Sequence, residues 1–241
     1  MSEPELSVVI PAFNEAQRLP ATLARIREYL AGASYEIVVA DDGSSDGTAE
    51  RARAAGDQAL RVVRSEHNRG KGHAVRQGML AARGIQRLMT DADLSTPIEE
   101  LARLRALAGE GFEVVIASRA LAGARIEVRQ PRYRESVGRA FNVLVRALLL
   151  PGLHDTQCGF KLFSARAAQE IFTATRLDGF GFDVEALVIA RQRGYRIAEL
   201  PVTWRNDAAT RVSTTRGLLA FLDLARIRWN AWRGRYDGSG L

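Results

Sequence analysis

Residues 88–96 read LMTDADLST, an apolar run that ends in two aspartates one residue apart, Asp91 and Asp93. A short apolar run bounded by polar residues is typical of a buried β-strand. Two carboxylates placed close together repel each other unless a cation lies between them. Mg²⁺ and Mn²⁺ bind a few carboxylates and take their other ligands from water and phosphate oxygens. The stretch therefore predicts a strand whose tip holds a metal–diphosphate site.

Similar apolar runs lie on both sides of this stretch and alternate with segments of helical period. Strands are expected at residues 6–12, 35–44, 59–65, 85–90 and 112–119, and helices at residues 19–30, 44–56, 72–84 and 98–107. Alternation of strand and helix with short apolar strands predicts an α/β fold with a mainly parallel central sheet flanked by helices.

The second half of the chain shows a weaker pattern. It predicts a long arginine-rich loop at 121–135, a helix at 137–148 and a glycine-centred turn between short strand-like pieces at 155–164. A helix at 182–194, a strand at 195–204 and a last helix whose apolar stripe runs from 218 to 232 follow. There is no linker, repeat or low-complexity segment. We therefore expect one main domain over residues 1–210, followed by a basic amphipathic helix within 211–241.

Residues that could line one edge of the sheet stand at the ends of most of the strands expected in the first half. They are Pro11, Phe13, Asn14, Glu15, Asp41, Asp42, Gly43, Ser44, Asp91, Asp93, Ser118 and Arg119. Any one such tip would suit an ordinary turn. In a parallel sheet, however, ligands bind at the carboxyl ends of the strands, and these ends share one edge. Four tips of this kind favour a common cleft.

The charge balance points to an anionic partner. The chain of 241 residues has a net charge of +6, and 34 of its residues are Lys or Arg. Only Lys71 and Lys161 are lysines, so arginine, which binds phosphate in a bidentate way, dominates. Nucleic acid, a phosphate-bearing ligand or an anionic membrane would each fit. Acidic strand tips argue against nucleic acid, and the aromatic residues do not interleave with the basic clusters as base-stacking platforms would.

Other residue types narrow the chemistry. The single Cys158 excludes an internal disulfide, and His67, His73 and His154 have no nucleophile partner of the usual pattern. The start of the sequence lacks the features of a signal peptide, and no apolar run reaches the roughly 20 residues that span a bilayer. We expect a cytoplasmic protein.

Residues 68–75, NRGKGHAV, are not a phosphate-binding P-loop, because Lys71 is followed by glycine. Val75 also stands where a dinucleotide-binding loop has its third glycine, which disfavours that fold. Backbone amides of this loop, with Arg69 and Lys71, could still approach a phosphate.

Seven segments in this order resemble the family-2 inverting glycosyltransferases, and within them the dolichyl- or polyprenyl-phosphate glucosyl- and mannosyltransferases. The segments are SVVIPAFNEAQRL, YEIVVADDGSSDGT, NRGKGHAVRQGM, MTDADLSTP, IASR, DTQCGFKLF and LPVTWR, and they extend from about Leu6 to Arg205. The pieces DTQCGFKLF and DADLSTP are closer to the glucosyl branch.

The resemblance implies a single nucleotide-diphospho-sugar transferase domain of the Rossmann-like GT-A type, and it implies roles for matching residues. Catalysis would rest on Asp91, Asp93 and Arg119. Nucleotide binding would involve Pro11, Phe13, Asn14, Glu15, Asp41, Gly43, Lys71, Asp91 and Ala92. The metal ligands would be Asp91 and Asp93, with Ser95 where mannosyl relatives often carry glutamine. The acceptor phosphate would contact Arg119, Arg134, Arg139 and Arg205, and the sugar or acceptor loop would include Gln157 and Lys161.

The implied reaction moves a hexose, glucose before mannose, from UDP-glucose or GDP-mannose to a polyprenyl or dolichyl phosphate with Mg²⁺ or Mn²⁺. A lipid phosphate is already ionised and needs no general base. A related transferase with a sugar hydroxyl as acceptor is the alternative, and Asp155 is then the candidate base. A nucleotidylyltransferase is disfavoured, because a glycine-rich basic loop does not follow the first strand.

The segment 214–236, TTRGLLAFLDLARIRWNAWRGRY, combines a Leu/Trp stripe with five arginines. Such a helix suits the surface of an anionic membrane, here the inner face of the cytoplasmic membrane. A helix packed on the domain, or on a second copy in a dimer, fits the same pattern. The sequence leaves both interpretations open and does not fix the oligomeric state.

Overall fold

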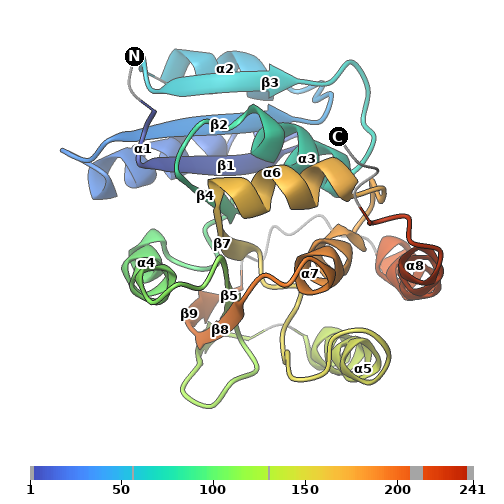
Figure 1. Cartoon of the computed structure of the whole chain (residues 1–241). Coiled ribbons are helices and arrows are strands. Elements are labelled where there is room, and N and C mark those ends of the chain that lie inside the picture. Colours follow the sequence, from blue (N-terminus) through green and yellow to red (C-terminus); the bar gives the residue numbers. More distant parts are fainter. Residues whose placement is uncertain (1–2, 56, 130, 207–213, 238–241) are drawn as a thin grey trace.

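The computed structural model describes residues 3–55, 57–129, 131–206 and 214–237, without the side chains of residues 132, 134 and 214–220. Within this part, a seven-stranded sheet has the order β3-β2-β1-β4-β7-β5-β8 (Figure 1). Its strands are β1 (Leu6–Ala12), β2 (Tyr35–Asp41), β3 (Leu60–Arg64), β4 (Gln86–Thr90), β5 (Val114–Ser118), β7 (Phe160–Ser164) and β8 (Ile197–Pro201). All neighbouring strands except those beside β7 run parallel, which confirms the predicted sheet.

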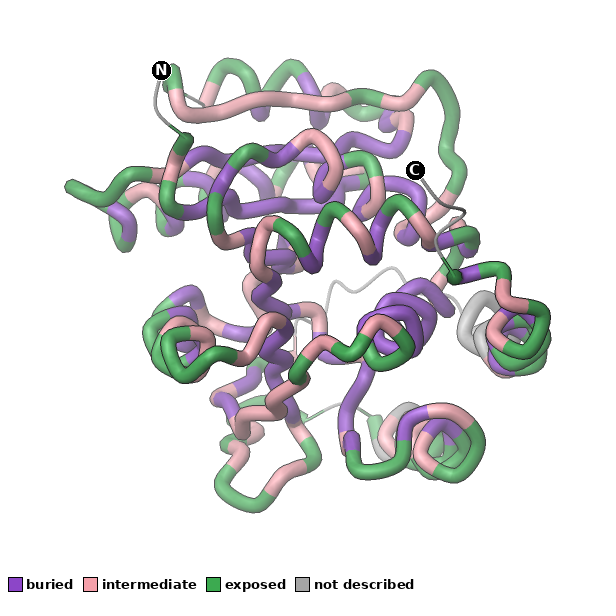
Figure 2. The backbone as a smooth tube through the Cα atoms, in the orientation of Figure 1, coloured by how far each residue is buried: buried purple, intermediate pink, exposed green. Residues whose placement is uncertain are grey.

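Helices cover both faces of the sheet, and this explains why the strands are apolar throughout. In β1, Val8 and Ile10 pack with one group of helices and Val9 with the other. The first group is α1 (Leu19–Tyr29), α2 (Thr48–Ala55), the 3₁₀ turn η1 (Ile98–Glu100) and α4 (Leu101–Gly109). The second is α3 (Lys71–Ala81), α5 (Arg132–Leu148), α6 (Ala165–Ala174), α7 (Phe182–Gln192) and α8 (Thr214–Trp232). In Figure 2, burial is concentrated in the strands and in α7.

The structure corrects the prediction of a loop at residues 121–135. This segment contains the strand β6 (Arg125–Val128), and α5 already begins at Arg132. β6 is mostly exposed, so it lacks the apolar alternation from which strands are recognised. The strand expected at 195–204 is also divided, because the chain leaves β8 after Pro201 and β9 (Thr203–Arg205) pairs with β6 in a separate two-stranded sheet.

The glycine-centred turn expected at 155–164 leads into a central strand. β7 lies between β4 and β5 and is antiparallel to both. Helix α6, which the sequence did not predict, follows directly, and Ser164 caps it by accepting a hydrogen bond from the Ala167 amide at 3.2 Å. Because β7 is reversed, its beginning meets the carboxyl ends of β4 and β5. Residues 153–159 are thereby brought to the edge where ligands bind in such sheets.

Helix α8 is joined to the main domain by its buried side. Leu224 and Ile227 belong to the same hydrophobic cluster as α7, and Tyr236, just beyond the helix, is buried there as well. Among the described residues, no helix combines the length and the apolar character that crossing a membrane requires.

Candidate active site

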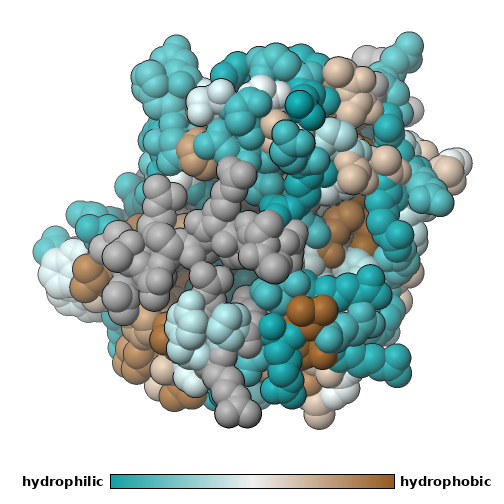
Figure 3. Space-filling view, turned by 180° about the vertical axis from the view of Figure 1, so that it is seen from behind, coloured by the Kyte–Doolittle hydropathy of each residue, from teal (hydrophilic) through white to brown (hydrophobic). Residues whose placement is uncertain are grey.

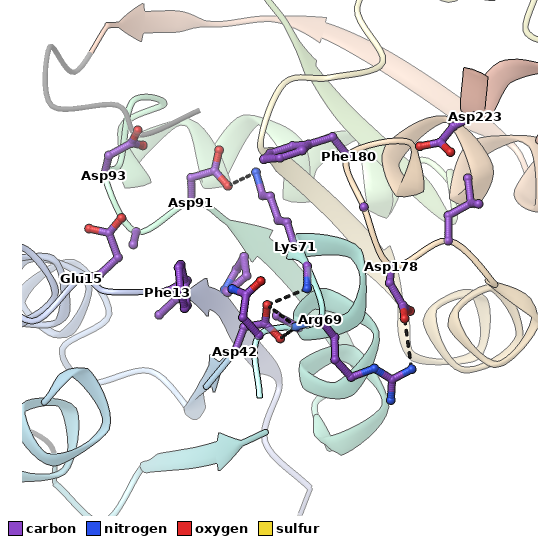
Figure 4. A pocket seen from close by; sticks show the side chains of 18 of the residues that line it. Phe13, Glu15, Asp42, Arg69, Lys71, Asp91, Asp93, Asp178, Phe180 and Asp223 are labelled. Carbon is purple, nitrogen blue, oxygen red and sulfur yellow. Dashed lines mark hydrogen bonds and ion pairs between the residues drawn. The ribbon is translucent and has the colours of Figure 1, made fainter. Parts of the chain in front are cut away.

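A cavity of about 770 Å³ lies at the carboxyl ends of β1, β2 and β4 (Figure 4). We call it the first cavity. Of the residues predicted from the sequence to bind nucleotide or metal, it is lined by Pro11, Phe13, Glu15, Lys71, Asp91, Ala92 and Asp93. Three of the four predicted strand tips, those of β1, β2 and β4, therefore converge on one cavity. The fourth does not, because Arg119 after β5 lines a different cavity.

The turn after β1 presents Phe13 and Glu15 to this cavity. Asn14 adopts a left-handed backbone conformation with φ of 57° between them. Its amide donates a hydrogen bond to Ser44 Oγ at 2.9 Å, and its Oδ1 accepts one from the Ser45 amide at 3.0 Å. Asn14 thus shapes the turn and does not line the cavity.

The structure places Asp42, and not Asp41, at the wall of the first cavity. The Asp41 carboxylate is buried, accepts a hydrogen bond from the Ser44 amide at 3.2 Å and pairs with Arg64. Asp42 accepts hydrogen bonds from the amides of Arg69 at 3.1 Å and Gly70 at 2.7 Å. Asp42 therefore fixes the glycine loop. Gly43 supports this turn without lining the cavity.

Lys71, at the start of α3, forms an ion pair with Asp91 at 2.6 Å (Figure 4). Burial alone would lower the pKa of the Lys71 ammonium, but the carboxylates of Asp91 and Asp183 outweigh it and raise that pKa. Burial raises the pKa of the Asp93 carboxyl, and the negative charge of Asp91 raises it further. Burial and the neighbouring carboxylate thus both disfavour a negative charge on Asp93, which a bound cation would offset.

Gly159 is a site residue that the sequence reasoning did not single out. A Cβ atom at this position would lie 2.0 Å from Asp91 Oδ2, so only glycine lets the loop before β7 pass the carboxylate. The Gly159 carbonyl also accepts a hydrogen bond from the Asp91 amide at 3.1 Å. The glycine in DTQCGFKLF was the available signal.

Asp91 and Asp93 fit a divalent cation held jointly with a diphosphate. Both line the first cavity, and Mg²⁺ or Mn²⁺ takes one or two protein carboxylates and completes its shell with phosphate oxygens and water. In the described part of the chain, no three His, Cys, Asp or Glu side chains group around one point for a metal. Ser95 does not line the cavity; its amide donates to Asp93 Oδ1 at 2.9 Å and thereby orients that carboxylate.

The far wall of the first cavity was not predicted from the sequence. It consists of Arg176, Leu177, Asp178, Gly179 and Phe180, in the loop before α7, and of Leu222, Asp223 and Arg226 on α8. Asp178 accepts hydrogen bonds from Arg69 at 3.0 Å and Arg76 at 2.5 Å. A Cβ atom at Gly70 would lie 2.3 Å from the Asp178 carbonyl oxygen, so the glycine loop and this wall are tightly apposed.

A second cavity, of about 320 Å³, is lined mainly by polar and basic residues. They are Arg119, Ala120, Ile126, Arg129, Glu135, Gly138, Arg139, Asn142, Asp155, Gln157 and Trp204. Arg119 Nε and Nη2 donate to the two oxygens of Asp155 at 2.7 and 2.9 Å. Burial alone would raise the pKa of the Asp155 carboxyl, but the Arg119 guanidinium outweighs burial and holds that pKa below its usual value.

Only some of the residues predicted to contact the acceptor line the second cavity. Arg119, Arg139 and Gln157 line the second cavity. Arg205 is exposed on β9, pairs with Glu127 and does not line it. Arg134 belongs to α5, but its side chain lies outside the described residues.

Lys161 is buried within the sheet and lines neither cavity. Its ammonium forms an ion pair with Asp183 and donates to the Cys158 carbonyl at 2.6 Å. The partners are buried together, so the ammonium is compensated without a ligand.

Comparison with known proteins adds the family context. The pattern described as Glycosyl transferase family 2 matches residues 7–172. The chain is 32% identical to a dolichyl-phosphate beta-glucosyltransferase of Dictyostelium discoideum, over 93% of this chain and 74% of that protein. It is 35% identical to the human dolichyl-phosphate beta-glucosyltransferase, over 83% of this chain and 67% of that protein.

Solved structures of similar fold agree with the predicted GT-A architecture. Mannosyl-3-phosphoglycerate synthase from Rubrobacter xylanophilus superposes with a TM-score of 0.71 at 21% identity, covering 96% of this chain and 75% of its own. Glucosyl-3-phosphoglycerate synthase from Mycobacterium tuberculosis, in complex with Mn²⁺ and uridine-diphosphate-glucose, gives a TM-score of 0.65 at 24% identity, covering 95% of this chain and 78% of its own. At these identities the likeness establishes the fold alone.

Proposed function

This chain belongs to glycosyl transferase family 2, and from that premise we propose that it transfers glucose from UDP-glucose to a polyprenyl or dolichyl phosphate with inversion. That it is a glycosyltransferase follows from the family itself. The donor, the acceptor and the divalent cation form the proposal, in which mannose from GDP-mannose is the next candidate donor.

One observation carries the proposal: the loop before β7 connects the first cavity, which holds the Asp91–Asp93 pair, with the second cavity, in which three arginines outnumber two carboxylates. Asp91 and Asp93 line the first, whereas Arg119, Arg129 and Arg139 line the second. Carboxylates suit a metal-bound diphosphate, and arginines suit a phosphate that arrives without a metal. The segment 155–159 joins them, because Asp155 holds Arg119 and Gly159 contacts Asp91.

The reaction then needs little from the protein beyond positioning and charge. An oxygen of the lipid phosphate attacks the anomeric carbon, the bond from that carbon to the diphosphate breaks, and the nucleoside diphosphate leaves. Arg119 and Arg139 would hold the attacking phosphate, while Lys71 and the glycine loop would face the leaving diphosphate. A cation bound at Asp91 and Asp93 would supply neutralisation of the diphosphate charge.

A sugar hydroxyl acceptor would instead require a general base. The second cavity offers two carboxylates among the described residues, and both have cationic partners. Asp155 is held by Arg119, which lowers its pKa, and Glu135 lies 3.8 Å from Arg129. Asp155 is a weak base because its pKa is lowered, and Glu135 is paired with an arginine, so the geometry favours an acceptor that is already ionised.

The named relatives support the same choice. The similar proteins from Dictyostelium and human are called dolichyl-phosphate beta-glucosyltransferases, which favours glucose and a lipid phosphate. The Mycobacterium structure with Mn²⁺ and uridine-diphosphate-glucose is consistent with a divalent cation and a uridine donor. We further propose that the enzyme acts as a peripheral protein on the cytoplasmic side of the membrane that carries its acceptor.

The test is a panel of UDP- and GDP-sugars offered with a polyprenyl phosphate and either Mg²⁺ or Mn²⁺. We expect lipid-linked glucose from UDP-glucose, loss of product in EDTA and recovery with added metal. Product with sugar hydroxyl acceptors, and none with the lipid phosphate, would replace this function with the alternative.

A further inference from the structure

Helix α5 carries an apolar stripe that no other described element covers. Val137, Leu144 and Leu148 are 45%, 40% and 49% exposed. Their spacing of seven and four residues places them on one side of the helix, next to the side that carries the buried Phe141 and Val145. The stripe is part of a helix whose other positions Gly138, Arg139 and Asn142 line the second cavity.

Helix α8 has a comparable outer face. Leu222, Trp229 and Trp232 are 62%, 49% and 73% exposed, whereas Leu224 and Ile227 are buried in the core. The Arg233 guanidinium lies over the Trp229 ring, 4.5 Å from its centroid. An exposed pair of tryptophans beside arginines is unusual for a face that contacts only water.

The two faces adjoin where the helices meet. The rings of Phe141 on α5 and Phe221 on α8 pack edge to face with centroids 5.2 Å apart. Arg228 on α8 also donates to the Leu148 carbonyl of α5 at 2.7 Å. Figure 3 shows hydrophobic side chains at the edge of the molecule where these helices lie. We call Val137, Leu144, Leu148, Leu222, Trp229 and Trp232 the two-helix surface.

We propose that the two-helix surface docks on an anionic lipid bilayer, with α5 contributing as well as α8. This inference rests on the proposed function, because the bilayer is where a polyprenyl phosphate resides. Residues 132–148 contain four arginines and one glutamate, and residues 214–235 contain five arginines and one aspartate. Positive charge around an apolar face complements anionic headgroups, and tryptophan prefers the headgroup region.

Docking would also place both cavities at the membrane. Leu222, Asp223 and Arg226 of α8 line the first cavity, and α5 lines the second. A lipid phosphate could then enter the second cavity without its chain having to leave the bilayer.

Point variants of the full chain test the surface, because deletion of α8 would remove the buried Leu224 and Ile227. Flotation with phosphatidylcholine vesicles, with and without phosphatidylglycerol, measures binding in the absence of any acceptor. We expect binding to require phosphatidylglycerol, and both L144S/L148S and W229S/W232S to weaken it about ten-fold. Ile85, exposed to 57% outside this surface, provides the matched control Ile85→Ser, which should bind like the unaltered chain.

A second measurement needs no substitution. Vesicles made with brominated lipids should quench the tryptophan fluorescence of the unaltered chain. Trp204 is only 7% exposed, so quenching would report on Trp229 and Trp232. Absence of quenching together with absence of flotation would overturn the proposal. Equal binding by L144S/L148S and the unaltered chain would overturn the role of α5.

The same variants separate this proposal from the proposed function. Their transfer to a water-soluble, short-chain polyprenyl phosphate should stay within about two-fold of the unaltered chain, since none of the four substituted residues lines a cavity. If the unaltered chain bound vesicles but transferred no sugar, the proposed function would be wrong and the proposed lipid-binding surface would stand. Light scattering without lipid gives the remaining control, because a dimer that L144S/L148S dissociates would identify the surface as an interface between copies.

Discussion

Each cavity contains one prominent ion pair, and the two pairs differ in how far their carboxylates are buried. In the first cavity, the Asp91 carboxylate pairs with Lys71, and the two side chains are 32% and 25% exposed. In the second, Arg119 is held by both oxygens of Asp155, whose side chain is only 2% exposed. Glu199 in turn accepts a hydrogen bond from the Asp155 amide at 2.7 Å.

This difference separates an exchangeable ion pair from a fixed one. An incoming cation can take the place of Lys71 at Asp91 with little loss, because the pair is partly in water. Asp155 cannot leave Arg119 without stranding a buried charge. The first cavity is therefore suited to assemble around a metal and a diphosphate. The second is suited to receive a phosphate in a prepared position.

The largest effect is expected at the exchangeable side. Asp93→Ala should lower transfer by about 1,000-fold or more, because it removes half of the carboxylate pair proposed to hold the cation. The thermal midpoint should not fall, since the like-charge repulsion with Asp91 is relieved. The assay is transfer at saturating Mn²⁺ alongside a melting curve. Glu66→Ala, an exposed loop carboxylate, is the control, and a folded but fully active Asp93→Ala enzyme would remove Asp93 from the cation site.

The fixed pair can be compared directly with the exchangeable one through stability. Asp155→Asn should lower the free energy of unfolding by about 2 kcal/mol, because Arg119 loses its buried partner. Lys71→Met should change it by less than about 1 kcal/mol, since its ion pair is partly exposed. Denaturant titration of both variants measures the two values. If they proved equal, the distinction between the pairs would be wrong.

Substitution of an arginine that lines the second cavity should change the Michaelis constant, KM, for the lipid phosphate. Arg139 lines the second cavity, so Arg139→Ala should raise that KM about ten-fold and leave the KM for the nucleotide sugar unchanged. Arg205 lies outside the cavity and pairs with Glu127, so Arg205→Ala is the matched control with an expected change below about two-fold. If Arg205→Ala raised the KM for the lipid phosphate more than Arg139→Ala did, the acceptor phosphate would instead bind near Arg205.

The smallest effect concerns Glu185, which accepts hydrogen bonds from the Arg176 and Leu177 amides in the wall of the first cavity. Burial raises the pKa of this carboxyl above its unfolded value, so the folded state binds the additional proton. The contribution of Glu185 to the free energy of unfolding should therefore increase as the pH falls from the raised pKa towards about 4.5. The increase is at most about 1.4 kcal/mol per pH unit. Glu185→Gln should lack this slope, as unfolding free energies measured across that range will show. Parallel curves for both proteins would contradict the assignment.

Much of the first half could be predicted because its signals are local. Apolar strands, helical periods and acidic tips are enough to locate Phe13, Asp91 and Asp93 in the amino-acid sequence. The central position of β7 could not be predicted, since it depends on pairing with β4 and β5 across long stretches of chain. The part of the first cavity's wall formed by residues 176–180 could not be predicted for the same reason. Its side chains become site residues only because α7 and α8 carry that loop to the glycine loop.

The position of β7 also constrains the order in which the protein can acquire its site. Strands β1 to β4 can pair as they are made, but β5 has no direct partner among them. Only when residues 160–164 enter between β4 and β5 does the sheet become continuous. During synthesis from the N-terminus, Asp91 and Arg119 therefore emerge early and remain unconnected until about two thirds of the chain has been made. We expect the catalytic edge to form late and as a unit, with no partially active intermediate.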